Sequence, residues 1–300
     1  MKRLLLFACA CGFVATPAAQ EPDAKPNFSS QSELVVLHVA VKDKNGGYVG
    51  GLEQDSFTVL EDRRHQEISF FNNQDAPVTV GLLIDASGSM APNRDMVVAA
   101  SMAFAKAMNT QDEFFVLGFN EDIHAPLPAD KPFTNFEPTL RVALVQAIKA
   151  RGQTAIYDAL NAGLDYVQKG GFERQVLIVL SDGGDNASAQ TLEGVMGHAR
   201  RSGAAIYAVT LFDQDDHDAR PRVLRKLAHE TGGDAFTPRR ASDVMDSFTQ
   251  IARELRNVYT IGFVPPDTAE SAFRSIRVVA AAGDGRQLIA RTRAGYYARP

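Results

Sequence analysis

Short apolar runs alternate along the chain with longer stretches in which apolar residues recur every three or four positions. Short runs rich in β-branched and aromatic residues predict strands, and the 3.6-residue period predicts helices. Strands are predicted at 78–84, 113–119, 175–180, 204–211 and 235–236, and helices at 93–108, 138–149, 155–168, 189–201, 219–229 and 242–257. This alternation predicts an α/β fold, a doubly wound, mainly parallel sheet with helices on both faces.

Both ends of the chain show the strand pattern alone. Predicted strands cover 34–41, 57–60, 66–71, 258–264, 274–281 and 287–292, and a polar turn at 61–64 separates the second from the third. Because an isolated hairpin is marginally stable in water, we expect the two end segments to pack together as a small all-β domain. The predicted divisions are a signal peptide at 1–19, a flexible leader at 20–32, an N-terminal β segment at 33–76, the α/β domain at 77–257 and a C-terminal β segment at 258–300.

The first twenty residues have the features of an export signal. Two basic residues precede a run of eleven apolar residues, and small residues allow cleavage near Ala18 or Ala19. The run is about half as long as a ~30 Å bilayer core requires, so it predicts a cleaved signal peptide and not a membrane anchor. The alternative is a lipoprotein acylated at Cys9 or Cys11. We therefore expect a periplasmic or secreted protein whose mature chain has neither a thiol nor an integral membrane segment.

The charge of the mature chain restricts the class of partner. Removal of the two basic residues of the signal changes the formal net charge from −5 to −7. A net negative surface argues against a nucleic-acid or anionic-lipid partner, and it does not choose among protein partners.

Three loops that follow a strand or precede a helix carry oxygen-bearing side chains. In a parallel sheet such loops converge at the carboxyl ends of the strands, where α/β proteins hold their ligands. Two carboxylates and three hydroxyls, with no sulfur or imidazole, suit a hard divalent cation, Mg²⁺ best, with Mn²⁺ and Ca²⁺ as alternatives. The candidate metal ligands are Asp85, Ser87 and Ser89 in the first loop, Thr154 in the second and Asp182 in the third.

The balance of charge at these positions indicates what the ion does. Two carboxylates neutralise a divalent ion, and neutral hydroxyls add geometry without adding charge. The ion then stays electrophilic enough to accept a third carboxylate from outside the chain. We infer a site that docks an Asp or Glu of a protein partner through the metal.

Each motif also has a simpler explanation when taken alone. The Asp85–Ser89 turn could hold N-capping side chains, Thr154 could be a helix cap, and Asp182 could start an ordinary turn. Asp185 either orients the third loop or is a solvated turn acid. The acidic loop 213–218 fits a solvated run better than a second cation site. The three loops together favour the metal site, since structural context is what confirms a motif.

Two other functions stay open, a metal-assisted hydrolase and a structural exported domain with an empty metal site. Hydrolysis at the metal needs a general base, and the sequence specifies none. The histidines lack metalloprotease spacing, and there is neither a Gly-x-Ser-x-Gly elbow nor a phosphate-binding loop. We therefore expect a binding protein without catalytic residues.

The same residues resemble the metal-ion-dependent adhesion site of von Willebrand factor type A domains. The resemblance rests on Asp85–Ser89, Thr154 and Asp182, and on the flanking segments Gly152–Leu160 and Leu180–Asn186. It implies a Rossmann-like domain in which Ser87, Ser89 and Thr154 bind the ion directly, while Asp85 and Asp182 bind it directly or through water. The segment Arg151–Gln153 departs from the family pattern, in which two glycines are common before the threonine.

The ends of the chain resemble a bacterial, exported branch of that family. The segments that carry this resemblance are Val41–Gly46, Phe57–Asp62 and Gly295–Ala298. It implies an adhesion-type protein that acts through protein–protein contacts.

Overall fold

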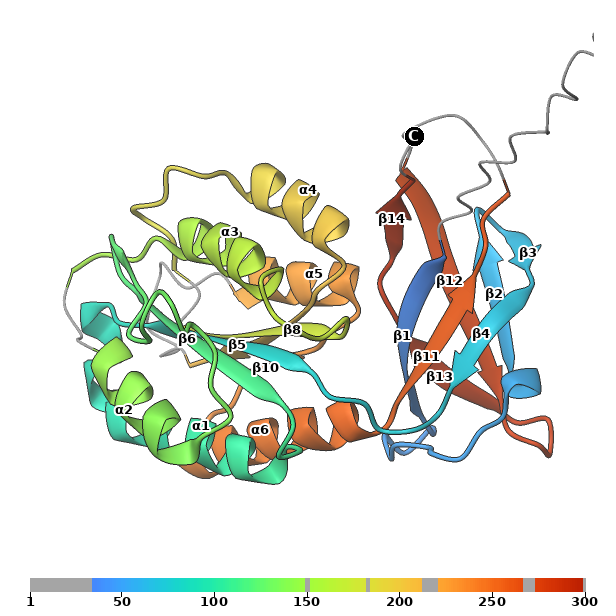
Figure 1. Ribbon diagram of the computed structural model, residues 1–300, viewed down its shortest axis with the longest axis horizontal. Coiled ribbons are helices and arrows are strands. Elements are labelled where there is room, and N and C mark those ends of the chain that lie inside the picture. Colours follow the sequence, from blue (N-terminus) through green and yellow to red (C-terminus); the bar gives the residue numbers. More distant parts are fainter. Residues whose placement is uncertain (1–33, 149–151, 182–183, 212–220, 267–272, 299–300) are drawn as a thin grey trace, which may run out of the picture. The chain divides into compact units, whose positions relative to one another are not determined.

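The computed structural model describes residues 34–148, 152–181, 184–211, 221–266 and 273–298 (Figure 1). Residues 33–300 form one compact unit, and the description that follows concerns this unit. The predicted signal peptide and leader lie outside the described residues. Across the described ranges, every helix is too short or too polar to cross a membrane.

A six-stranded sheet with the order β10-β9-β8-β5-β6-β7 forms the centre of the α/β part. Its strands are parallel except β7, which runs antiparallel to β6. The bounds are β5 (Thr79–Asp85), β6 (Glu113–Phe119), β7 (Ile123–His124), β8 (Gln175–Ser181), β9 (Ala205–Thr210) and β10 (Ala235–Phe236). The first strand, β5, is buried along its whole length and lies between β6 and β8. The strand order therefore reverses at β5, which is where open α/β sheets bind ligands.

Helices cover both faces of this sheet, as predicted. One face packs against α1 (Arg94–Ala107), α2 (Glu137–Ala147) and α6 (Ala241–Arg256), and the other against α3 (Ile156–Val167), α4 (Leu192–Ser202) and α5 (Pro221–Thr231) (Figure 1). Each face has its own cluster of buried apolar side chains.

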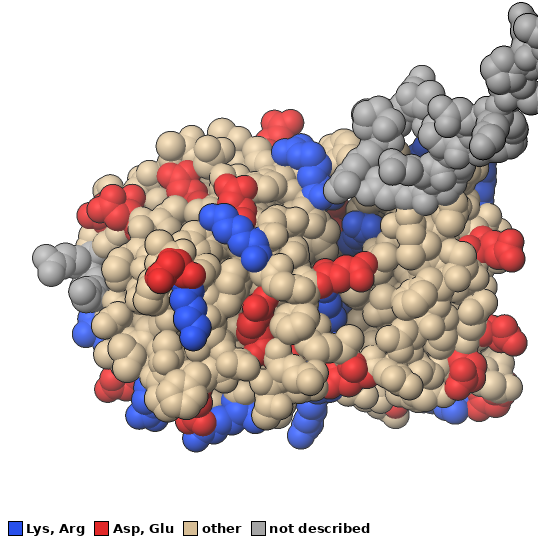
Figure 2. All heavy atoms as spheres, viewed as in Figure 1, with Lys and Arg blue, Asp and Glu red and all other residues tan. Residues whose placement is uncertain are grey.

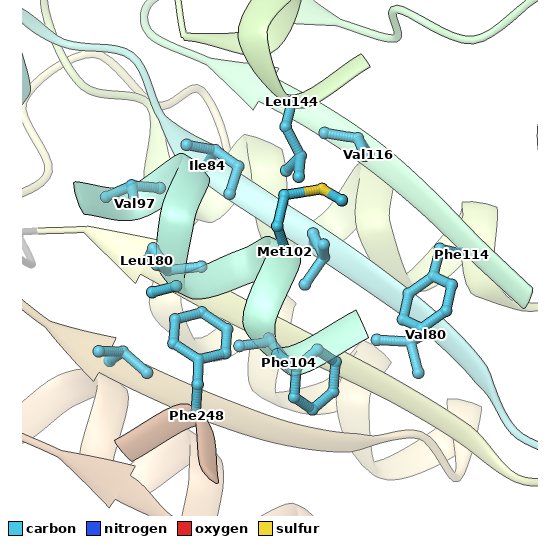
Figure 3. Packing of buried hydrophobic residues seen from close by; sticks show 14 of the residues in the cluster. Val80, Ile84, Val97, Met102, Phe104, Phe114, Val116, Leu144, Leu180 and Phe248 are labelled. Carbon is cyan, nitrogen blue, oxygen red and sulfur yellow. The ribbon is translucent and has the colours of Figure 1, made fainter. Parts of the chain in front are cut away.

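The core beneath α1 fixes the element that follows the first candidate loop (Figure 3). Phe104 of α1 lies with its ring centroid 5.6 Å from that of Phe248 on α6 and 6.2 Å from that of Phe114 on β6. Met102 and Val97 of the same helix are also buried, which confirms that α1 packs on the sheet. Burial of each such side chain contributes about 1.5–3 kcal/mol, so the position of α1 is strongly held.

Strands from the two ends of the chain form a second, eight-stranded sheet with the order β3-β2-β12-β13-β1-β11-β4, in which β14 also pairs with β12. The N-terminal strand β1 pairs with β11 and β13, and β2 pairs with β12. The bounds are β1 (Val35–Lys42), β2 (Phe57–Glu61), β3 (Arg64–Gln66), β4 (Ile68–Asn72), β11 (Val258–Phe263), β12 (Phe273–Ala281), β13 (Gln287–Arg291) and β14 (Gly295–Tyr297). Strands far apart in the sequence thus share one apolar cluster.

The strand predicted at 66–71 is confirmed over most of its length as β4, but its first residue, Gln66, ends a separate strand, β3. The two strands have different partners, since β3 pairs with β2 and β4 pairs with β11. The turn before them contains only Asp62 and Arg63, both with positive φ (46° and 68°), a conformation used in tight hairpins. The Asp62 carboxylate accepts hydrogen bonds from the amide and the hydroxyl of Ser275, each 2.9 Å long. This long-range contact holds a turn that its own sequence does not favour.

Several boundaries also differ from prediction. The helix predicted from 189 begins at Leu192, because the Thr191 hydroxyl caps it by accepting a hydrogen bond from the amide of Gly194 (3.2 Å). The first two residues of the helix predicted at 219–229 lie outside the described residues, and α5 is described from Pro221. A 3₁₀ helix, η2 (Gly88–Asn93), precedes α1, and η1 (Gln54–Ser56), β7 and β14 are further elements that the periodicity did not predict.

Candidate functional site

The first loop begins at the carboxyl end of β5 with Asp85, whose side chain is fully buried. Asp85 Oδ1 accepts a hydrogen bond from the amide of Ser87 (2.8 Å). Asp85 Oδ2 accepts one from the hydroxyl of Ser181, the last residue of β8 (2.6 Å). The carboxylate is therefore held both by its own loop and by the neighbouring strand.

The two serines of this loop lie side by side. Their Oγ atoms are 3.0 Å apart, and Ser87 is buried whereas Ser89 is exposed. Adjacent ligands of an octahedral Mg²⁺, with bonds of about 2.0–2.1 Å, are separated by about 2.9 Å. The spacing of the two hydroxyls therefore fits neighbouring positions around such an ion.

The second loop contacts both of the others. The Gly88 amide of the first loop donates to the Gly152 carbonyl (3.4 Å). The Thr154 amide donates to Asn186 Oδ1 (2.9 Å), and the Thr154 carbonyl accepts from the amides of Asn186 (3.0 Å) and Ala187 (3.1 Å). The predicted convergence of the three loops at the carboxyl ends of the strands is thus seen in their backbone contacts.

Side chains of the third loop cap helix α3, which follows Thr154. The Ile156 amide donates to Asp185 Oδ1 (3.0 Å), and the amides of Tyr157 and Asp158 donate to the hydroxyl of Ser188 (3.0 and 3.3 Å). Within the described residues, these bonds satisfy the first turn of α3 without the Thr154 hydroxyl. Asp185 therefore orients the third loop, the first of the two roles considered for it.

The backbone at Gly152 is specific to glycine. Its φ of +87° is strained for any L-residue, and a Cβ there would come within 1.8 Å of Glu121 Oε2. The same Glu121 oxygen accepts the Gln153 amide (2.8 Å), which fixes the second loop against the segment after β6. The departure from the family pattern in the segment before Thr154 therefore leaves Gly152 and Thr154 in place.

An open depression of about 330 Å³ lies beside the first loop. Ala86, Phe119 and Asn120 line it next to β5 and β6, and Glu121 and Asp122 give it an acidic rim. The carboxyl edge of the sheet therefore offers an accessible surface next to the loop that carries Ser89.

Asp182, the predicted ligand of the third loop, lies outside the described residues, as does the acidic loop 213–218. In the described part of the chain, no group of three or more His, Cys, Asp or Glu side chains lies close enough to hold a metal. A metal at this edge would depend on the hydroxyl oxygens of Ser87, Ser89 and Thr154 together with carboxylates. The hydroxyl-rich donor set fits a hard cation.

Supporting residues of this edge were not identified from the sequence. Ser181 binds Asp85, Asn186 holds Thr154, and Ser188 caps α3. All three lie in the polar run 181–188, which begins at the last residue of β8, and this run was the available signal.

Comparisons with known proteins identify the fold. The family model described as von Willebrand factor type A domain matches residues 80–270. No curated protein matches the chain significantly.

Three solved structures share the architecture, each with a TM-score of 0.50. A von Willebrand factor type A protein from Catenulispora acidiphila is 15% identical over 82% of this chain and 75% of its own. A mutant of the PilB minor pilin from Streptococcus sanguinis is 13% identical over 60% of this chain and 62% of its own. Proximal thread matrix protein 1 from the mussel byssus is 18% identical over 64% of this chain and 49% of its own. At these identities the structures show the fold alone, and the family match covers more than half of the residues. The chain therefore belongs to the von Willebrand factor type A domain family.

Proposed function

We propose that this protein binds a divalent cation, Mg²⁺ in preference, at a metal-ion-dependent adhesion site, and that the ion docks an Asp or Glu of a protein partner. The ligands are Asp85, Ser87, Ser89, Thr154 and Asp182. The observation that carries the proposal is the pair of serine hydroxyls 3.0 Å apart, at an edge where two further loops meet.

Each described side chain has a distinct part in this arrangement. The hydroxyls of Ser87, Ser89 and Thr154 supply neutral oxygens, whereas Asp85 supplies charge. The bonds from the Ser87 amide and the Ser181 hydroxyl hold the Asp85 carboxylate in position before any ion binds. When bound, the ion would be coordinated by two carboxylates of this chain. It could then still bind a third carboxylate, supplied by the partner.

The surface and the fold relatives support a protein partner. Acidic and basic side chains are interspersed on the face shown in Figure 2, without a basic patch of the kind that nucleic acids require. A minor pilin and a byssus thread protein share the fold. We infer an exported adhesion-type module, which agrees with the predicted signal peptide.

Calorimetric titration of the purified chain with magnesium sulfate tests the metal. The proposal predicts a saturable isotherm for one site, abolished by a chelator. Absence of heat and of a thermal shift would leave a structural domain with an empty site. Hydrolytic turnover that disappears on chelation and returns with Mg²⁺ would favour the hydrolase.

Capture from envelope extracts tests the docking step. The immobilised protein should retain a partner in Mg²⁺ and release it in EDTA, and the Ser89→Ala variant should retain much less of it. Equal retention with and without Mg²⁺ would show that contacts other than a bridging ion hold the partner.

A further inference from the structure

A second cluster of polar groups lies at the opposite edge of the central sheet, around the amino ends of β8 and β9. There a cavity of about 30 Å³ is enclosed by β1, the ends of α5 and α6 and the segment that joins β13 to β14. Its polar lining includes two arginines, Arg174 and Arg293, with His38 and Thr292. Among the described residues that line it, none carries a carboxylate.

Two hydrogen-bond donors at this cavity have no partner among the described residues. Arg293 donates through Nη2 to the Val36 carbonyl (3.0 Å), but its Nε is inaccessible to solvent and unpartnered within the described residues. The Thr292 hydroxyl is also inaccessible to solvent and has no hydrogen-bond partner among the described residues. Buried polar groups are normally hydrogen-bonded, so two unpaired donors beside one cavity indicate that the cavity holds an acceptor.

In the part of the chain that the structure describes, no carboxylate pairs with either guanidinium group. Arg174 is 6% exposed and donates through Nη2 to the Leu255 carbonyl, and neither it nor Arg293 forms an ion pair with a described residue. The nearby acids already have partners: Asp75 and Asp112 pair with Arg256, while Asp234 and Glu254 pair with Arg291 and Lys42. A buried cation without a partner costs several kcal/mol, so a negative charge is expected beside the arginines.

The protonation of the lining supports a net positive charge. Burial lowers the pKa of Arg174 and of Arg293 to about 10, which leaves both charged at neutral pH. Burial, and then the charges of the two arginines, lower the pKa of His38 to about 3, so this imidazole is neutral. The cavity is thus positive because of the arginines alone.

We propose that this cavity binds a small monovalent anion of the size of chloride, between Arg174 and Arg293. One water-sized sphere needs about 10–15 Å³ of such space, so a cavity of about 30 Å³ has room for a halide ion. The anion accepts the Arg293 Nε–H and Thr292 O–H bonds and neutralises charge between β1 and the amino edge of the central sheet. This site is independent of the proposed metal site at the other edge.

Thermal unfolding in chloride-free buffer tests the proposal. Sodium chloride or bromide replaces sodium gluconate at constant ionic strength, and Tm is measured at each step. A saturable rise of Tm with halide is expected. In Arg293→Gln the apparent halide affinity should fall about tenfold or more, since a hydrogen bond to a charged group contributes about 1.5–3 kcal/mol. The matched control Arg277→Gln, at an exposed position on β12, should stay within about twofold of wild type.

Bromide-soaked crystals of the wild-type protein provide a readout that needs no variant. An anomalous peak beside Arg174 and Arg293 supports the site, even if Arg293→Gln does not fold. The proposal is overturned if halide and gluconate give the same Tm, or if bromide peaks lie only elsewhere and the cavity holds water.

Discussion

At the scale of single residues, the candidate metal site has one ligand, Ser89, whose replacement should affect metal binding more than it affects stability. Asp85, Ser87 and Thr154 are buried, whereas Ser89 is exposed. Removal of the Asp85 carboxylate would leave the Ser87 amide and the Ser181 hydroxyl without their acceptor, and each such loss costs about 1–3 kcal/mol. Ser89 is therefore the better position for a test of metal binding.

Ser89→Ala is expected to weaken Mg²⁺ binding about tenfold, since one ligand of roughly 1.4 kcal/mol is lost. Its metal-free Tm should fall only slightly, because Ser89 is exposed and its hydroxyl bond to Ser87 contributes about 0.5–1.5 kcal/mol. Calorimetric titration and metal-free thermal unfolding measure the two effects. Ser69→Ala, at an exposed serine on β4, is the control and should bind Mg²⁺ like wild type. Equal affinities for the two variants would contradict the role of Ser89.

His38 should make the protein less stable in mild acid. Burial, and then Arg174 and Arg293, lower its pKa to about 3, so between about pH 6.5 and 3 the unfolded chain binds a proton that the folded chain does not. The free energy of unfolding contributed by His38 is then fully present above pH 6.5. It falls as the pH drops, by up to about 1.4 kcal/mol per unit.

Urea unfolding at several pH values in chloride-free buffer measures this dependence, because a bound anion would offset the two arginines. His38→Asn should flatten the slope between pH 6.5 and 4, whereas His65→Asn, at an exposed position, should retain it. The same slope in wild type and His38→Asn would show that His38 is not the titrating group.

At the scale of elements, the end of α6 is tied to both sheets through a buried carboxylate. Glu254 accepts hydrogen bonds from the hydroxyls of Tyr207 on β9 (2.6 Å) and Tyr48 (2.8 Å), and it pairs with Lys42 on β1 (3.4 Å) and with Arg291 on β13. Burial, and then the charge of Glu254, raise the pKa of Tyr207 well above its usual value, so its hydroxyl remains a donor.

Glu254→Ala should therefore destabilise the protein by about 3–5 kcal/mol, because it removes one of the two carboxylates beside Arg291 and Lys42 and leaves the buried Tyr207 hydroxyl without its acceptor. The midpoint of urea unfolding measures this loss. Asp246→Ala, an exposed acid on the same helix, should change the free energy of unfolding by less than about 0.5 kcal/mol. A small effect of Glu254→Ala would mean that solvent reaches the network and screens it.

Local sequence patterns predicted the helices and strands and the convergence of the three loops. The features that they did not predict depend on contacts between residues far apart in the sequence. The 3.6-residue period located the six helices because each buries an apolar face on the sheet. The break between β3 and β4 within the strand predicted at 66–71 was missed because their partners, β2 and β11, lie on opposite sides of the α/β part in sequence. The cavity between Arg174 and Arg293 has no local signal, since those residues are more than a hundred positions apart.

At the scale of the whole molecule, both ends of the chain complete one sheet. β1 finds its partners in β11 and β13, and β4 pairs with β11. The N-terminal strands therefore depend on residues near the C-terminus, and they cannot form this sheet until the rest of the chain has been made.

A chain that ends at residue 257 should lose order in its N-terminal strands while the α/β core persists. Without β11–β13, β1 and β4 have no strand partner, and β2 and β3 form only an isolated hairpin, which is marginal in water. Limited proteolysis followed by mass spectrometry should find rapid cleavage within 35–72 in the shortened chain and slow cleavage in the intact one. Equal protection of that segment in both would contradict the dependence.

The central claim concerns the carboxyl edge, where Ser87, Ser89 and Thr154 would hold a divalent ion. Anomalous diffraction from crystals soaked in Mn²⁺ tests this most directly, because it locates the metal without reference to a partner. The account predicts a strong peak within about 2.5 Å of the hydroxyl oxygens of Ser87 and Ser89, since ligand bonds to such ions are about 2.0–2.6 Å long. A crystal saturated with Mn²⁺ that shows no peak at this edge would contradict it.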